Sequence, residues 1–114
     1  MAEPCLLGID TSNYTCSAAV YYPVEGKIRQ SKQLLPVKEG EKGVRQSDAV
    51  FHHTVLLPQM LEALADSLPS VESVGVSDRP SCRKDSYMPC FMVGLGTAKA
   101  IAAARGAQYY TTTH

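Results

Sequence analysis

The sequence predicts an α/β fold in which helices pack on a mixed β-sheet, and three observations carry this prediction. The chain has 114 residues, of which 45% are hydrophobic and 19% are charged, and a chain of this length buries roughly two thirds of its unfolded surface. Its apolar residues recur first with strand spacing and later with helical spacing. Turn-forming residues divide these segments into the order β-β-β-α-β-α-β, which fits a single domain over residues 1–114.

The first half of the chain predicts three antiparallel strands. Residues 5–10 (CLLGID) form a short apolar run typical of a buried strand, and residues 14–22 (YTCSAAVYY) are β-branched, aromatic and small. Residues 27–36 alternate between polar and apolar, which predicts a third, partly exposed strand. Residues 37–46 hold two glycines and five charges and predict a solvated loop.

The second half predicts two crossover units. Leucine and valine recur every three or four residues over 48–67, which indicates one face of a helix. Residues 71–76 alternate as a fourth strand, and residues 77–88 read as a polar loop. A helix rich in small residues follows over about 89–105, and residues 107–112 form the last strand. Because crossovers between parallel strands are right-handed, the helices are expected to cover the sheet.

Composition limits the classes of function. Eleven basic residues balance eleven acidic ones, so no electrostatic footprint for nucleic acid or an anionic membrane is present. No apolar run approaches the ~18 residues of a membrane span, and the first residues lack the pattern of a secretory signal. We therefore expect a soluble, cytoplasmic protein. Its cysteines, which form no C-x-x-C pair, are expected to be reduced thiols rather than zinc ligands: Cys5, Cys16, Cys82 and Cys90.

The hairpin at Asp10, Thr11 and Ser12 is the first candidate site. A carboxylate at the end of a first strand, followed by hydroxyl residues in a tight turn, suits phosphate and hydrated magnesium. The alternative is an ordinary hairpin in which Asp10 and Asn13 only form the turn.

Two neighbouring histidines near the start of the long helix form the second candidate. Adjacent side chains on a helix point about 100° apart, so His52 and His53 do not easily ligate one metal. His53 shares a helix face with Leu57, Met60 and Leu64, which predicts that it faces the sheet as a hydrogen-bonded residue at the edge of the core. His52 is predicted to face solvent.

A stripe of small residues on the second helix is the third candidate. Gly94, Ala98 and Ala102 allow close approach either to the chain's own sheet or to a partner helix. The last residue, His114, belongs by spacing alone to a frayed end.

Taken together, these segments resemble a known family on the ribonuclease-H-like fold, the unit that is duplicated in actin, sugar kinases and Hsp70. LLGIDTSNYTCSAAVYY resembles the opening of the TsaD-type proteins, which form threonylcarbamoyladenosine in tRNA and were long described as O-sialoglycoprotein endopeptidases. SDAVFHHTVLLPQMLEAL resembles their first helix, with His53 at the histidine position, and MVGLGTAKAIAAAR resembles their second helix. The resemblance runs through the whole chain in order and implies the N-terminal lobe of a two-lobe, actin-like protein.

The resemblance also implies a site. In complete family members a divalent metal, iron or zinc, and a nucleotide take part in carbamoyl transfer to an adenosine of tRNA. It places Asp10, Thr11 and Ser12 at the nucleotide phosphates, makes His114 a metal ligand, and gives His53 a supporting role. The sequence departs from the family at Asn13 and Tyr14, at the glycine-rich loop and beyond His114, where the second histidine and second lobe would follow. Catalytic residues are unknown, the chain alone is expected to be inactive, and whether it binds metal or nucleotide stays open.

Two alternatives compete with the catalytic interpretation. The TsaB-type relatives share the lobe, lack the chemistry and dimerise through its helices, so a homodimer or heterodimer is expected here; tRNA would be reached only through a complete protein or complex. A ribonuclease-H-like nuclease needs several carboxylates around two metals. Asp10 has no evident acidic partner, since Glu62 and Asp66 are predicted on the helix surface.

Overall fold

The computed structural model describes residues 3–12, 15–36, 46–79 and 89–113. Within them the chain forms a mixed β-sheet and two α-helices. The strands are β1 (Cys5–Thr11), β2 (Thr15–Tyr22), β3 (Lys27–Leu34), β4 (Val71–Arg79) and β5 (Gln108–Thr113), and the helices are α1 (Gln46–Glu62) and α2 (Phe91–Arg105). The order of strands and helices along the chain is the one that the sequence predicts.

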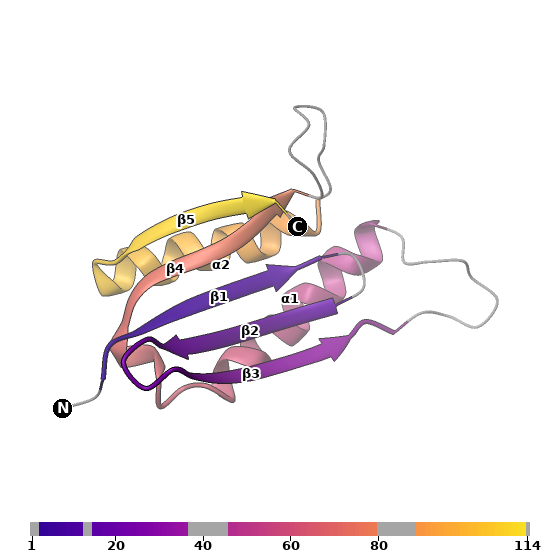
Figure 1. Ribbon diagram of the computed structural model, residues 1–114. Coiled ribbons are helices and arrows are strands. Elements are labelled where there is room, and N and C mark those ends of the chain that lie inside the picture. The colour runs from indigo at the N-terminus through magenta and orange to yellow at the C-terminus, as the bar shows by residue number, and fades with distance from the viewer. Residues whose placement is uncertain (1–2, 13–14, 37–45, 80–88, 114) are drawn as a thin grey trace.

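The five strands lie side by side in the order β3-β2-β1-β4-β5 (Figure 1). The pairs β1–β2 and β2–β3 are antiparallel, as two tight hairpins require. The pairs β1–β4 and β4–β5 are parallel; α1 leads from β3 across to β4, and α2 joins β4 to β5. The predicted α/β fold with a mixed sheet is therefore confirmed.

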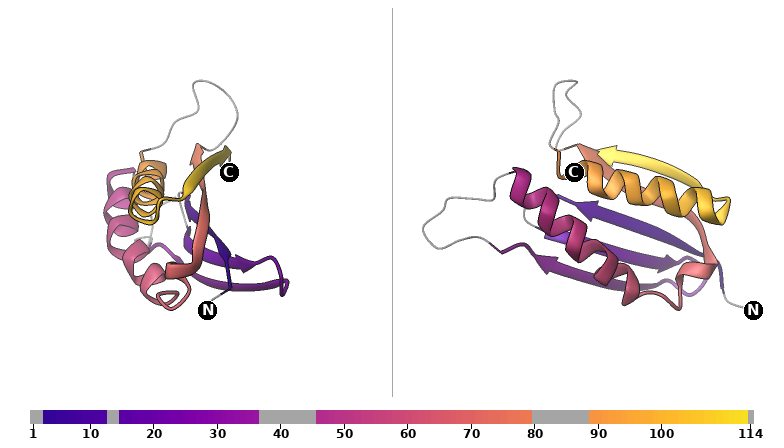
Figure 2. Two further views of the ribbon diagram at one scale, coloured as in Figure 1. Left: turned by 90° about the vertical axis from the view of Figure 1, so that its left-hand side faces the viewer. Right: turned by 180° about the vertical axis from the view of Figure 1, so that it is seen from behind.

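Both helices cover the same face of the sheet (Figure 2, left). α1 packs on β2 and β3, and α2 packs on β4, β1 and β5. Along β1 and β2 buried residues alternate with more exposed ones, so the inward side chains form the core between sheet and helices. No helix of the described residues lies on the opposite face, which we call the open face.

Two element boundaries differ from the sequence prediction by three residues or more, and the others differ by at most two. α1 ends at Glu62 rather than near residue 67. After it the backbone tightens, since the amide of Leu64 bonds the carbonyl of Leu61 at 2.9 Å and the amide of Ser67 bonds that of Leu64 at 2.9 Å. β4 runs to Arg79 rather than residue 76, because its pairing with β5 continues through Ser77.

The tightened segment after α1 is fixed to the sheet through Ser67. The Ser67 hydroxyl hydrogen-bonds the hydroxyl of Tyr22 and accepts a bond from Arg29 Nη1 at 2.7 Å, while the same Arg29 nitrogen lies 2.8 Å from Asp66. The Ser67 carbonyl accepts from the thiol of Cys5 at 3.4 Å. An uninterrupted helix would carry Ser67 away from these partners, which explains the early end of α1.

The thiols of Cys5, Cys16 and Cys90 are buried and form no disulfide. Burial, with the nearby Asp10 carboxylate, raises the pKa of Cys16 to about 11, so this thiol stays protonated at neutral pH. The fourth cysteine, Cys82, lies outside the described residues, as do most of the loops expected at 37–46 and 77–88. Neither described helix is both long and apolar enough to cross a membrane.

Candidate functional site

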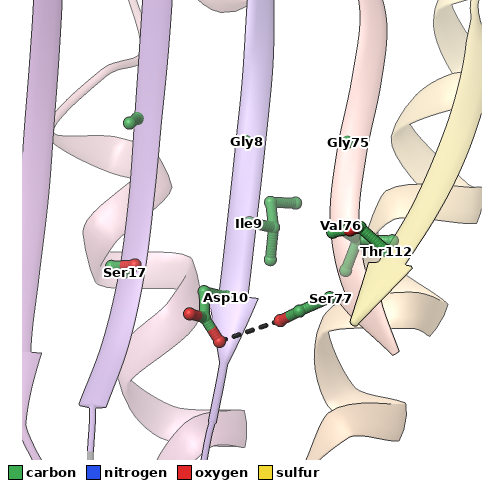
Figure 3. Close-up of a pocket in the computed structure, with 9 residues that line it drawn as sticks. Gly8, Ile9, Asp10, Ser17, Gly75, Val76, Ser77 and Thr112 are labelled. Carbon is green, nitrogen blue, oxygen red and sulfur yellow. Dashed lines mark hydrogen bonds between the residues drawn. The ribbon is translucent and has the colours of Figure 1, made fainter. Parts of the chain in front are cut away.

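The carboxyl ends of β1 and β4 meet at one edge of the sheet, because these strands are parallel neighbours. Asp10 and Ser77 are the side chains that meet there on the open face. One carboxylate oxygen of Asp10 accepts a hydrogen bond from the Ser77 hydroxyl at 2.9 Å (Figure 3) and another from the backbone amide of Ser12 at 2.9 Å. Sequence reasoning found Asp10 but missed Ser77, because it ended the fourth strand at residue 76 and placed Ser77 in the loop that follows.

The side chain of Thr11 does not point out of the hairpin toward a phosphate, as the sequence resemblance implies. It is fully buried, its hydroxyl donates to the carbonyl of Cys90 at 2.9 Å, and it accepts from the amide of Gly94 at 3.0 Å. The Thr11 hydroxyl therefore joins the carbonyl of the residue before α2 to an amide of the first turn of α2. The expectation that Thr11 faces a phosphate does not fit this geometry, because its side chain already joins β1 to α2.

His53, on α1, supports the same hairpin from the side of the sheet that the helices cover. It is fully buried, and its Nε2 lies 2.6 Å from the carbonyl oxygen of Ser12, so the ring donates this proton to the hairpin. Among the described residues Nδ1 has no hydrogen-bond partner. Burial lowers the pKa of His53 below its usual value, although the carbonyl of Ser12 and the charge of Asp10 oppose this. His53 is therefore a neutral imidazole that holds the hairpin through its hydrogen bond to the Ser12 carbonyl.

Ser12 is also engaged in the turn. Its hydroxyl lies 3.4 Å from the carbonyl of Thr15, and the residue is nearly buried. Asp10 remains the half-exposed member of the predicted phosphate-binding set.

The small-residue stripe of α2 faces the chain's own sheet. Gly94, Ala98 and Ala102 are all buried, and a methyl group added at Gly94 would lie 2.8 Å from Thr11 Oγ1 and 3.2 Å from Ile9 Cγ2. The prediction that this stripe is a partner face is therefore corrected: close packing on β1 and β4 uses it.

The open face carries a shallow trough. Its polar end is a depression of about 380 Å³ lined by Gly8, Ile9, Asp10, Ser17, Ala19, Gly75, Val76, Ser77 and Thr112 (Figure 3). A second depression of about 370 Å³ shares Gly8, Ala19 and Gly75 and continues toward Leu6, Tyr21 and Tyr110. Small residues form its floor and large apolar residues its far end.

A metal centre of the family type is not formed by the described residues. No three His, Cys, Asp or Glu side chains converge among them, and His114, the metal ligand that the resemblance implies, lies outside them. Glu62 and Asp66 are exposed on the helix side, as predicted. The described donor set therefore does not fit the metal, and no chemical step is assigned to it.

The geometry defines a ribonuclease-H-like fold, and comparisons with solved structures agree. YeaZ from Pseudomonas aeruginosa matches with a TM-score of 0.68 and 19% identity over 96% of this chain and 44% of that chain. A second structure, described as an uncharacterized protein with similarity to peptidase YeaZ from Pseudomonas aeruginosa, matches at 0.67 and 19% over 96% and 43%. RuvC from Thermus thermophilus in complex with a Holliday junction substrate matches at 0.52 and 16% over 97% and 65%.

At these identities the matches establish the shared fold, and the chain spans less than half the length of either YeaZ-like chain. No protein-family model matches the sequence, and no curated protein matches it.

Proposed function

We propose that the chain is a non-catalytic lobe of the TsaB (YeaZ) type, which serves the formation of threonylcarbamoyladenosine in tRNA by associating with another protein. The observation that carries this proposal is the fold likeness to YeaZ, with a TM-score of 0.68 over 96% of the chain. The sequence resemblance to the related TsaD-type proteins, which covers both helices and the first hairpin, supports a role in the same tRNA modification.

The environment of the hairpin favours a scaffold over a transferase. A phosphate site needs hydroxyls and amides that point toward the ligand. Here Thr11 binds the start of α2, and the amide of Ser12 binds Asp10. Opening these bonds to admit a phosphate would loosen the junction between β1 and α2. The TsaD-type transferase interpretation, with Asp10 and Ser12 at a nucleotide and His114 on a metal, remains a prediction.

The outward surfaces of the two helices are the association surface that we propose. On α1 Phe51 and Val55 are exposed one turn apart, and on α2 Met92 is exposed. Gly96 follows Met92 by one turn, and a methyl group added there meets no atom within 4 Å. Exposed apolar and small side chains on neighbouring helices allow a partner helix to pack closely.

Sedimentation of the chain alone, and of the chain with a TsaD-type protein from the same source, tests this proposal. We expect a dimer or a stable complex that Phe51→Glu disrupts and that Gln30→Glu, an exposed change on β3, leaves intact. The chain alone should give no transfer from threonylcarbamoyl-adenylate to tRNA. Transfer above background would support the catalytic interpretation instead, and a monomer that binds no such partner would contradict the scaffold.

A further inference from the structure

The start of α1, residues 46–53, is held against the sheet by few buried side chains. Among its described side chains, Ala49 and His53 are fully buried and Val50 is partly buried. The remainder of the helix buries three large apolar side chains: Leu56, Leu57 and Met60. Because apolar burial is the dominant attraction between packed elements, the start of α1 depends on His53 far more than the rest of the helix does.

His53 connects the start of α1 to the hairpin that follows β1. Its Nε2 lies 2.6 Å from the carbonyl oxygen of Ser12, which is 41 positions away in the chain. The amide of Ser12 in turn donates to a carboxylate oxygen of Asp10 at 2.9 Å. One imidazole therefore joins α1 to the turn that also positions the Asp10 side chain.

The buried site of the ring suits only its neutral form. Since Nε2 donates its proton to a carbonyl, Nδ1 of the neutral ring carries a lone pair, and no described residue forms a hydrogen bond with Nδ1. A second proton would create a charged N–H on Nδ1 without an acceptor among the described residues. A buried charge without a hydrogen-bond partner is costly, so the protonated ring gains free energy by moving into water.

The charges nearest His53 do not remove this penalty. Burial is the largest effect and lowers the pKa of His53 below its ordinary value of 6.5; the Ser12 carbonyl and the Asp10 carboxylate oppose it, and His52 adds to it. Asp48, five positions earlier on α1, is partly exposed to water. The net result is a ring that is neutral in the folded chain at pH 7.

The other elements that pack on α1 bring no free charge to the described surroundings of the ring. On β2 the thiol of Cys16 has a pKa of about 11 and stays protonated. On β3 the guanidinium of Arg29 is paired with Asp66, beyond the opposite end of α1. On α2 residues 91–98 carry no ionisable acid or base. Protonation of His53 is therefore not compensated from these elements.

We propose that His53 is an acid-sensitive latch between α1 and the hairpin. When the ring takes a second proton from solvent it leaves its buried site, its bond to Ser12 breaks, and the start of α1 separates from the hairpin while the sheet and the rest of α1 stay folded. Such local openings need less free energy than global unfolding. Phe51 lies on the same segment, so opening would also withdraw it from the association surface; the latch itself does not rest on that surface.

Amide hydrogen exchange followed by NMR between pH 5 and pH 8 tests the latch. The Ser12 amide reports on the hairpin, and the Leu57 amide, which bonds the His53 carbonyl in a regular helix, reports on α1. The Leu7 amide on the central strand reports on global unfolding. After correction for the intrinsic exchange rate, protection at Ser12 and Leu57 should be lower than at Leu7 and should fall about tenfold per pH unit below pH 6.5.

His53→Gln and His52→Gln form a matched pair of variants. The glutamine amide can donate to the Ser12 carbonyl but does not titrate, so His53→Gln should make protection at Ser12 independent of pH. His52→Gln removes the neighbouring imidazole and should keep the fall. The ring nitrogens of the unaltered chain give a reading that needs no variant, since their ¹⁵N shifts at pH 7 should show the proton on Nε2 and none on Nδ1.

Three results would overturn the latch. Equal protection at Ser12 and Leu7 at every pH would mean that His53 acts only through global unfolding. Protection at Ser12 that does not fall below pH 6.5, or that still falls in His53→Gln, would remove His53 as the cause. A proton on Nδ1 at pH 7 would mean that Nε2 does not donate to the hairpin.

Discussion

The junction between Thr11 and Gly94 gives the sharpest test of how the fold is held together. In Gly94→Ala the added methyl carbon would lie 2.8 Å from Thr11 Oγ1, 3.2 Å from Ile9 Cγ2 and 3.3 Å from Val76 Cγ2. The Thr11 oxygen cannot rotate away freely, because it is buried and holds two hydrogen bonds. The sheet and α2 must therefore separate slightly.

The magnitude follows from three opposing terms. Overpacking of a tight core costs about 1–3 kcal/mol, and weakening of the bond from the Gly94 amide costs about 1 kcal/mol. Replacing glycine by alanine inside a helix returns about 1 kcal/mol. We expect Gly94→Ala to lower the free energy of unfolding by about 1–3 kcal/mol.

Urea unfolding followed by far-ultraviolet circular dichroism measures this change, and Gly96→Ala is the matched control. Gly96 lies on the same helix with open space around it, so alanine there should raise the free energy of unfolding by about 1 kcal/mol. The two variants should differ in sign. Equal stabilisation by both would refute the packing of α2 against Thr11.

Three further substitutions probe the buried polar contacts. Thr11→Val keeps the shape but removes both hydrogen bonds of the hydroxyl, to the Cys90 carbonyl and from the Gly94 amide, and should lower the free energy of unfolding by about 2 kcal/mol in urea unfolding; an unchanged midpoint would contradict this contact. Burial keeps the pKa of His53 in the folded chain below its ordinary value of 6.5. As the pH falls, the unfolded chain therefore binds the proton first. The free energy of unfolding should be highest above pH 6.5 and should decrease below it. Thermal unfolding from pH 8 to pH 5 measures this slope, which His53→Gln should flatten; a slope that survives in the variant belongs to another group. Ser67→Ala removes the partner of Tyr22 and Arg29, and should cost about 1–2 kcal/mol by urea unfolding, whereas a neutral result would show that solvent replaces the hydroxyl.

The arrangement of strands and helices could be predicted from the sequence because period and turn chemistry are local properties. Residues 5–10 and 27–36 carry strand patterns that no tertiary contact overrides, and the structure places strands there. Gly106 at the end of α2 has a φ of 66°, which few residues other than glycine adopt. These features need no knowledge of distant segments.

The face of α2 that meets the sheet could not be predicted in the same way. Between Gly94 and Arg105 small residues occur on every side of the helix, so the sequence offers several small stripes at helical spacing. The choice depends on Thr11, which is 83 positions from Gly94 in the chain. A side chain on β1 thus selects the buried stripe, and the neighbouring stripe through Gly96 is left outward.

The same limit applies to the candidate site. Asp10 is visible in the sequence because it ends an apolar strand, but its partner Ser77 is 67 positions away and has no distinctive motif. The role of Thr11 is also set at a distance, since a threonine after an aspartate suits a phosphate loop as well as a hydrogen-bonded contact with a distant helix. The local sequence is compatible with either role of Thr11, and only the packing of α2 on β1 decides between them.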